Sequence, residues 1–388
     1  MNTDTLYAKV KDEIISVRRQ IHMHPELAFE EFKTAEIICS FLKKHGIDYT
    51  DSIAKTGICA KLGKEGGKAL LIRADMDALP INENTDLEYA SKENGKMHAC
   101  GHDIHIAVAL AAAYVLKQYE NELDGCVKII FQPAEETTGG AKPMIDEGIM
   151  ENPKVTAAIG GHVTPALEVG KVWLKKGALM ASPDDFSVRF IGKSTHGAEP
   201  QNGISPIIPA AEFALGIKDY VLNSISDDSH CVLSVCTISG GNSVNIIPDE
   251  TTVIGTFRSF SENSRQTAAK AIETLADSIA KKHGAKVEVK YNFLYPPVIN
   301  DALITEKMHS ILTKTIGSEN IIHLEKPLMT GEDFSYFANE VPSVFLWYGC
   351  SDGVNTSPLH SDKFIADERA IETAVNIFCE FAKDYFKI

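Results

Sequence analysis

Residues 97–105 constrain this chain more than any other stretch, because nine positions hold one cysteine, three histidines and an aspartate. Cys100 and His102 flank Gly101, so the backbone can turn tightly and direct both side chains to one point. Thiolate and imidazole are donors that zinc and similar divalent ions prefer. The apolar, alanine-rich pattern from Ile106 to Leu116 predicts a buried helix directly afterwards. Incidental histidines at a helix cap are the alternative, but ligand types rarely cluster so densely by chance.

The composition of the chain bears on its partners and on its cellular compartment. The net charge of −15 over 388 residues disfavours nucleic acid and anionic membranes as partners. The sequence shows neither an apolar run of membrane-spanning length nor a signal-peptide pattern at its N-terminus, so we expect a cytoplasmic protein. Scattered cysteines fit a reducing compartment. Six of the eight lie in apolar patterns and are expected to be buried thiols rather than disulfides: Cys39, Cys59, Cys126, Cys231, Cys236 and Cys379.

The first half of the chain alternates predicted helices with predicted strands. Apolar residues from Leu6 to Ile21 recur at helical spacing and predict one amphipathic helix. Three apolar runs then lead in turn to Asp75, to the pair Glu135-Glu136 and to His162; they span 69–75, 126–131 and 156–160. Open α/β sheets place their sites at such strand ends. The alternation predicts an α/β fold with a mainly parallel sheet and helices on both faces.

A different order of elements begins near Ser182-Pro183. From there the chain reads strand, helix, strand, strand, helix, strand, which is the order of a ferredoxin-like α+β unit. Pro296-Pro297 marks the return to the first pattern. We therefore expect an inserted domain at 183–295, hinged at these prolines as a mobile lid. The remaining segments, 1–182 and 296–388, would form one discontinuous metal-dependent catalytic domain.

Further ligand candidates follow the predicted strands. Because Glu135-Glu136 comes directly after a strand, the two side chains should point in opposite directions. One carboxylate could then bind metal while its neighbour acts as a general base; a solvated acidic pair is the alternative. His162, after two glycines that would give the backbone room, and His360 are weak candidates when each is taken alone. Five side chains together suffice for two ions that share a bridging ligand: Cys100, His102, Glu136, His162 and His360.

These motifs resemble the signatures of the two-metal aminoacylase branch of the zinc-peptidase clan. That branch includes hippurate hydrolases, N-acyl-amino-acid amidohydrolases, auxin-conjugate hydrolases and N-acetyldiaminopimelate deacetylases. The resemblance implies a zinc-peptidase-like α/β/α catalytic domain with an inserted ferredoxin-like lid that also serves in dimerisation. It extends from Arg18 to the C-terminal helix and is carried by residues 97–103, 133–136, 139–141, 331–334 and 359–360.

The resemblance also implies roles for individual residues. The five ligand candidates would hold two divalent ions per chain, of zinc, manganese, nickel or cobalt, and Glu135 would be the general base. Asp75 matches the aspartate that supports the metal site, with Asp77 left open for that role. In the inserted domain, His196 matches a histidine that completes the site in related dimers, so the resemblance implies a possible homodimer through the lid. Asn245 and Arg258 match residues that hold the substrate's carboxylate. A departure from many relatives is Thr137-Thr138, where they carry a glycine.

The implied function is hydrolysis of the amide bond of small N-acyl amino acids. Alternatives are a dipeptidase or aminopeptidase of the same clan, or an N-acetyldiaminopimelate deacetylase of lysine biosynthesis. Peptidases of the clan usually carry a histidine where this chain has Asp75 and an aspartate where it has His102, which favours acylated amino acids. A metal-binding protein without turnover is disfavoured because it has no use for a base such as Glu135. The acyl group stays open among acetyl, benzoyl and indole-acetyl.

Overall fold

The computed structural model describes residues 2–64, 66–226 and 230–388. Contacts divide the chain into two compact units. Unit 1 comprises Met1–Leu179, Ile299–Lys326 and Asp333–Ile388, and unit 2 comprises Met180–Val298 with Pro327–Glu332. The assignment of a catalytic role to one unit and a lid role to the other stays a prediction.

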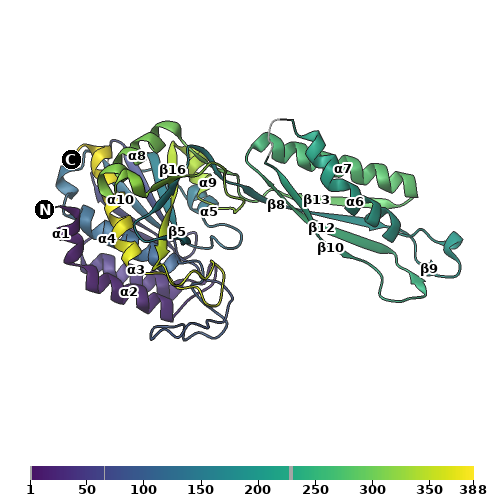
Figure 1. The fold of residues 1–388 in the computed structure, drawn as a ribbon, viewed down its shortest axis with the longest axis horizontal. Coiled ribbons are helices and arrows are strands. Elements are labelled where there is room, and N and C mark those ends of the chain that lie inside the picture. The colour runs from purple at the N-terminus through teal and green to yellow at the C-terminus, as the bar shows by residue number, and fades with distance from the viewer. Residues whose placement is uncertain (1, 65, 227–229) are drawn as a thin grey trace. The chain divides into compact units, whose positions relative to one another are not determined.

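Unit 1 is built on one mixed sheet with the strand order β1-β2-β4-β3-β5-β16-β6-β15 (Figure 1). Its central strands β4, β3, β5 and β16 are parallel, whereas β1, β2 and β6 each run antiparallel to a neighbour. The prediction of a mainly parallel sheet therefore holds for the centre alone. The strands are β1 Asp48–Ile53, β2 Gly57–Gly63, β3 Ala69–Asp75, β4 Cys126–Gln132, β5 Val155–Glu168, β6 Val172–Leu174, β15 Ile321–His323 and β16 Ser343–Ser351.

Helices cover both faces of this sheet. The helix α4 (His102–Lys117) is the innermost, and all of its residues except Tyr114 and Lys117 are buried. Two adjacent glycines of β5 mark the two faces, because a side chain at Gly161 would meet Phe378 of α10 and one at Gly160 would meet Phe334 beside α9. The other helices of the unit are α1 Thr3–Ala8, α2 Lys11–Met23, α3 Phe32–Lys44, α5 Ala141–Asp146, α8 Ala302–Thr315, α9 Ser335–Glu340 and α10 Arg369–Phe386, with 3₁₀ turns at Glu120–Glu122 and Ser318–Asn320.

Three details of unit 1 differ from the sequence prediction. The N-terminal helix is broken at Lys9 and Val10 into α1 and α2; Val10 stays buried, so the apolar periodicity hides the break. Strand β5 continues to Glu168, so His162 lies within the strand rather than after it. Gly160 and Gly161 make room for packing of Phe334 and Leu346 rather than for approach to a site.

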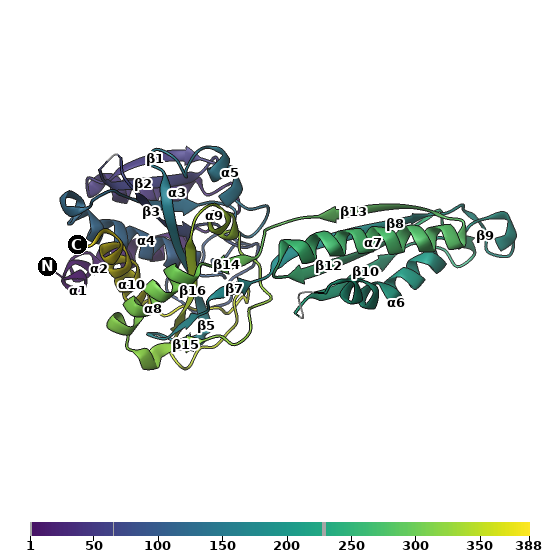
Figure 2. The same ribbon diagram turned by 90° about the horizontal axis from the view of Figure 1, so that it is seen from above.

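Unit 2 has the β-α-β-β-α-β order of a ferredoxin-like unit. Its sheet is antiparallel, with the strand order β10-β12-β8-β13, and helices α6 and α7 cover one face of it (Figure 2). The predicted fold class, an α/β unit together with a ferredoxin-like α+β unit, is therefore confirmed. The elements are β8 Ser182–Ile191, β9 Thr195–His196, α6 Ile207–Ser224, β10 Val232–Ser239, β11 Ile246–Ile247, β12 Glu250–Ser259, α7 Glu262–His283 and β13 Lys286–Asn292, with a 3₁₀ turn at Pro200–Asn202; strands β7 Gly177–Met180 and β14 Val298–Asn300 pair separately.

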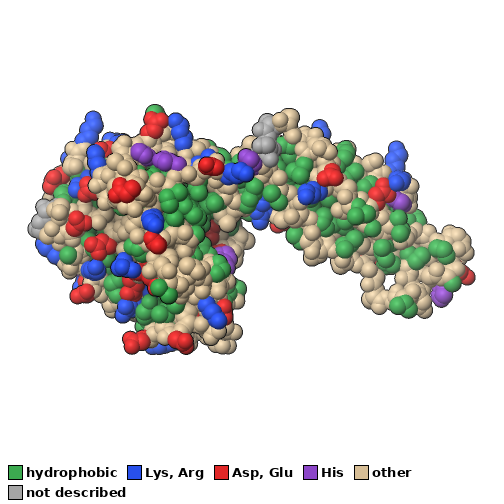
Figure 3. All heavy atoms as spheres, viewed as in Figure 1, with side chains coloured by type: hydrophobic (Ala, Val, Ile, Leu, Met, Phe, Trp, Pro, Cys, Tyr) green, Lys and Arg blue, Asp and Glu red, His purple; other side chains and the backbone are tan. Residues whose placement is uncertain are grey.

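The surface of unit 2 carries large hydrophobic side chains, and hydrophobic atoms are visible over this unit in Figure 3. They recur on α6 and on the edge strand β10: Ile207, Ile208, Leu215, Tyr220, Val232 and Ile238. Cys236, also on β10, is exposed, so the prediction of a buried thiol is wrong there, because the last part of this edge strand, residues 236–239, is exposed on both faces. Among the described residues, no helix combines the length and the hydrophobicity that crossing a membrane requires.

A buried carboxylate joins three elements of unit 2. Asp184 of β8 accepts hydrogen bonds from Arg265 Nε (2.9 Å) and Nη2 (2.8 Å), from the Tyr291 hydroxyl (3.0 Å) and from the Leu294 N–H (3.1 Å). Its side chain is inaccessible to solvent and that of Arg265 is 5% exposed. Removal of one partner would leave the other as an uncompensated buried charge.

Asp184→Ala should therefore lower the free energy of unfolding of unit 2 by about 3–5 kcal/mol. Arg189→Ala is the matched control, because Arg189 lies on the same strand but pairs with Glu250 and Glu288 at the surface. The control should cost less than about 1 kcal/mol. Urea unfolding followed by circular dichroism measures both values, and equal costs for the two variants would contradict the assignment.

Candidate metal centre

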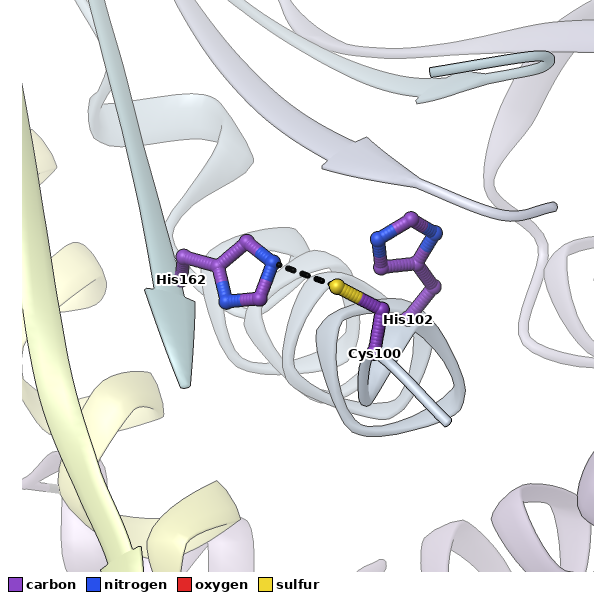
Figure 4. A group of neighbouring side chains, drawn as sticks. All are labelled: Cys100, His102 and His162. Carbon is purple, nitrogen blue, oxygen red and sulfur yellow. Dashed lines mark hydrogen bonds between the residues drawn. The ribbon is translucent and has the colours of Figure 1, made fainter. Parts of the chain in front are cut away.

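The loop before α4 directs Cys100 and His102 to one point, as the sequence predicts. Gly101 lies between them with φ +82°, and a Cβ placed there would lie 2.4 Å from Cγ2 of Val163 on β5. Both the left-handed backbone and the close approach require glycine. In Figure 4 the sulfur of Cys100 lies beside the imidazole rings of His102 and His162. The cluster therefore lies where the N-terminus of α4 touches the central strand β5.

His162 presents one ring nitrogen to Cys100. Its Nε2 lies 3.2 Å from Cys100 Sγ, and its Nδ1 lies 2.7 Å from the carbonyl oxygen of Val163. Because a carbonyl can only accept, Nδ1 carries the proton and Nε2 offers a lone pair. Ligand-type atoms of Cys100, His102 and His162 all lie within 4.8 Å of one another.

His102 is oriented in the same way, and its second ring nitrogen is left without a hydrogen-bond partner. His102 Nδ1 lies 2.8 Å from the carbonyl oxygen of Asp77, so Nε2 is the nitrogen that faces the cluster. His102 Nε2 is buried without a hydrogen-bond partner and lies 3.9 Å from Glu136 Oε1. A buried polar atom of this kind is costly unless something outside the protein binds it. The donor set and this atom fit a divalent cation.

The turn after β4 brings Glu135 and Glu136 to this cluster together. Ala134 has a left-handed backbone (φ +57°), which ends the extended geometry of β4. The N–H groups of Glu135 and Glu136 then donate to Oδ1 and Oδ2 of Asp77, each at 3.0 Å. Carboxylate oxygens of both glutamates lie within 4.8 Å of each other and of a ring nitrogen of His102. The prediction that they point in opposite directions is wrong, because they lie in a turn and not in a strand.

His360 reaches the cluster from the loop that follows β16. Its backbone is left-handed (φ +63°), and its N–H donates to the carbonyl oxygen of Ala99 at 2.8 Å. Its Nε2 lies 3.2 Å from Glu136 Oε1, and its side chain is 53% exposed. Ligand-type atoms of Cys100, Glu136 and His360 form a further group within 4.8 Å. Unit 1 thus brings all five ligand candidates together with Glu135.

Asp75 and Asp77 both qualify from sequence as the aspartate that supports the metal site, and they make different contacts. Asp75 forms a buried salt bridge with Arg73 and lies 2.5 Å from His105 Nδ1, with His102 Nε2 at 3.7 Å. Asp77 orients both His102 and the turn of the two glutamates. Asp77 therefore holds His102 from its Nδ1 side and Asp75 lies on its Nε2 side, and which of the two supports the metal site stays a prediction.

Further buried residues, which the sequence reasoning passed over, support the cluster. His105 accepts a hydrogen bond from the Val163 N–H at its Nε2 (3.0 Å), and its spacing of three residues from His102 on one helix could have revealed it. Asp333 accepts from Arg73 Nη2 (2.7 Å), from Gln132 Nε2 (2.7 Å) and from the Ala141 N–H (3.0 Å). It lies in a motif that carries the family resemblance, but nothing in its sequence context indicated these partners.

Burial shifts the pKa values of two ligand candidates, Cys100 and His162. It raises the pKa of the Cys100 thiol well above its usual value, and the carboxylates of Glu136 and Glu135 act in the same direction. It lowers the pKa of His162 well below its usual value, so that ring is neutral. A neutral imidazole is the form that binds metal, whereas a Cys100 thiolate needs a nearby cation to offset these effects.

His102 differs from His162, because its pKa is raised and not lowered. Burial acts to lower its pKa, but Asp75, Asp77 and Glu136 outweigh that effect and raise the pKa to about 10. So many carboxylates around one imidazole make the cluster electronegative and suited to a cation.

The three proposed substrate-binding residues lie in unit 2 and are not gathered at one point there. His196 on β9 pairs with Ile246 on β11 and is exposed, with its Nδ1 accepting from the Ala198 N–H (3.1 Å). Asn245 lies beside it, and its carbonyl oxygen accepts from the Gly197 N–H (2.7 Å). Arg258 lies near the far end of β12, roughly 25 Å along the strand from Glu250.

Known proteins resemble this chain over almost its whole length. The N-acetylcysteine deacetylase of Bacillus subtilis is 37% identical over 95% of this chain and 96% of its own. Thermostable carboxypeptidase 1 of Saccharolobus solfataricus is 36% identical over 94% of this chain and 93% of its own. The YXEP protein of B. subtilis, whose crystal structure is described as that of a dinuclear metal-binding M20 peptidase, superposes with a TM-score of 0.84 at 35% identity, covering 97% and 98% of the two chains.

The model of peptidase family M20/M25/M40 matches residues 71–384, which include every candidate ligand. The predicted relationship and the predicted enzyme class, a metal-dependent amidohydrolase, are thereby confirmed. The chain belongs to peptidase family M20/M25/M40.

Proposed function

We propose that this enzyme hydrolyses the amide bond of N-acyl amino acids, with Glu135 as general base. The observation that supports this most is the convergence of five ligand candidates, one of which has a buried nitrogen without a hydrogen-bond partner, on the turn that carries Glu135. The deacetylase activity in the name of the B. subtilis relative is in line with an acylated amino acid as substrate. A peptide substrate is the second candidate, because another relative is named a carboxypeptidase.

Five side chains would hold two divalent ions: Cys100, His102, Glu136, His162 and His360. When bound, such ions polarise a carbonyl group and lower the pKa of water. The choice among zinc, manganese, nickel and cobalt stays open, since imidazole, carboxylate and thiolate together suit several of these ions.

The protein's own residues then handle the proton. Glu135 is nine-tenths buried at the cluster, where it can take a proton from the attacking water. The same carboxyl group returns that proton to the amine as the amide bond breaks. Asp77 keeps the turn in place during both transfers through the N–H groups of Glu135 and Glu136.

A hydrolysis screen tests the proposal as a whole. N-acetyl, N-benzoyl and indole-acetyl amino acids would be compared with free dipeptides after reconstitution with each metal. We expect turnover of at least one acylated amino acid and a much lower kcat/KM for dipeptides. Preference for dipeptides would favour the peptidase function instead.

Cys100→Ala should lower bound metal and activity together, because Cys100 belongs to two ligand groups. Cys126→Ala is the matched control: that thiol is also buried, but it lies at the start of β4, the opposite end from the turn with Glu135. Metal content by inductively coupled plasma mass spectrometry, measured beside activity, checks the result. Full activity of metal-stripped enzyme under strong chelation would exclude the two-metal mechanism.

Glu135→Gln should keep the metal while kcat falls by about 10²-fold or more, because the amide cannot accept the proton. Glu122→Gln, at an exposed glutamate, should change neither quantity. The same metal analysis and steady-state kinetics decide whether Glu135 is the general base or a metal ligand. If metal is lost along with activity, Glu135 is a ligand rather than the base.

A homodimer in which His196 serves the partner's site is the proposal for unit 2, supported by the family resemblance and by the exposed hydrophobic residues of α6 and β10. Inactive His196→Ala chains mixed with inactive Glu135→Gln chains should then recover up to about a quarter of the activity, because half the dimers are mixed and each has one intact site. Subunit exchange is verified with two affinity tags. A fully exchanged mixture without activity would reject the shared site.

A further inference from the structure

Glu31 is a completely buried carboxylate with no part in the steps above. It directly precedes α3, more than a hundred residues from the glutamates of the site. Its carboxylate accepts three hydrogen bonds. The N–H groups of Phe29 and Ala134 both donate to Oε1 at 3.0 Å, and the Thr56 hydroxyl donates to Oε2 at 2.6 Å. Glu31 therefore joins the start of α3, the β1–β2 turn and the turn after β4.

Both backbone donors to Oε1 have a conformation that non-glycine residues rarely adopt. Phe29 has φ +59° and Ala134 has φ +57°. The left-handed region is unfavourable for a non-glycine residue, and it persists where surrounding groups hold it in place. At Ala134 this conformation turns the chain out of β4 and brings Glu135 to the cluster. The Glu31 carboxylate is the group that receives the Ala134 N–H in this conformation.

Three successive N–H groups of this turn are thus held by two buried carboxylates. Glu31 takes the N–H of Ala134, and Asp77 takes those of Glu135 and Glu136. The two acceptors come from different parts of unit 1, so they fix the turn from both ends. Without Glu31, the Ala134 N–H would be buried and unpaired, which is unfavourable, so the turn would relax to another conformation.

We propose that Glu31 is a positioning residue for the reaction: by accepting the Ala134 N–H, it sets the direction in which the Glu135 carboxylate faces the substrate. This inference rests on the proposed role of Glu135 as general base. The described hydrogen bonds of Glu31 involve none of the five ligand candidates, so we expect its effect in kcat rather than in KM.

The acceptor oxygen, and not the negative charge, should carry this role. Burial raises the pKa of Glu31 to about 7, so the neutral side chain is readily accessible near neutral pH. In Glu31→Gln the amide oxygen can take the place of Oε1 and accept both N–H groups, while the amide nitrogen faces the Thr56 hydroxyl. Glu31→Leu has a similar size and no acceptor.

The experiment compares three variants with the wild-type enzyme: Glu31→Leu, Glu31→Gln and the control Thr56→Val. The control removes the hydrogen bond to Oε2 and leaves both N–H bonds, so it should cost thermal stability without a change in kcat. Glu31→Leu should lower kcat roughly 10- to 100-fold with KM within about twofold, since small misplacement of a catalytic group has effects of this size. Glu31→Gln should stay within about threefold of wild type.

Hydrogen–deuterium exchange of the peptide that covers 132–138 gives a readout that does not depend on activity. Glu31→Leu should speed exchange in this peptide, with little change in β3 or α4, and Glu31→Gln should not. Faster exchange throughout unit 1 would indicate a merely structural role and overturn the inference. So would a folded Glu31→Leu enzyme with wild-type kcat, or equal losses of kcat in the Leu and Gln variants.

Failure of the proposed function has a different signature. In that case the wild-type enzyme itself turns over no N-acyl amino acid, while the exchange data still report whether Glu31 holds the turn. Wild-type turnover together with an unchanged Glu31→Leu variant refutes the positioning role alone.

Discussion

The rigid part of this site depends on a simple requirement: polar groups that are buried must be paired. Carboxylates and imidazoles lie in or shortly after the central strands β3, β4 and β5, and α4, which is buried along nearly its whole length, covers them. Each such group would be costly if left alone. Most of them are paired: Asp77 with two backbone N–H groups, Asp75 with Arg73 and His105, and Asp333 with Arg73 and Gln132. His102 Nε2, which stays unpaired among the described contacts of the cluster, is therefore informative about what binds there.

Backbone atoms do much of this pairing, and they determine chemistry as well as stability. A carbonyl oxygen holds Nδ1 of His102 and another holds Nδ1 of His162, so both rings present Nε2 to the cluster. The choice of nitrogen follows from the main chain and not from the histidines themselves. The same is true of the glutamate turn, where main-chain N–H groups, held by Asp77, decide where the carboxylates point.

The sequence reveals those features that depend on residue type and short-range pattern. Ligand types with a glycine between Cys100 and His102 indicated the site, and the bounds predicted for the strand that ends in Asp75 agree with β3. Features that depend on one φ angle or on contacts distant in sequence stayed hidden. The residue type of Ala134 does not indicate a left-handed backbone, so the predicted opposite directions of the Glu135 and Glu136 side chains are wrong. The pattern of a buried strand is likewise unchanged whether β5 stops before His162 or continues to Glu168.

The donors of the cluster differ in how firmly the fold holds them. His162 belongs to a central strand and His102 to a buried helix, and Gly101 locks these two elements against each other at van der Waals distance. His360, by contrast, is half exposed on the loop after β16, whose main chain is hydrogen-bonded to Ala99 at His360 and to Asn84 at Asp362. Ions of different radius need donor distances that differ by a few tenths of an ångström. A site with one rigid side and one more exposed side would suit several such radii, and the exposed His360 side chain would make the adjustment.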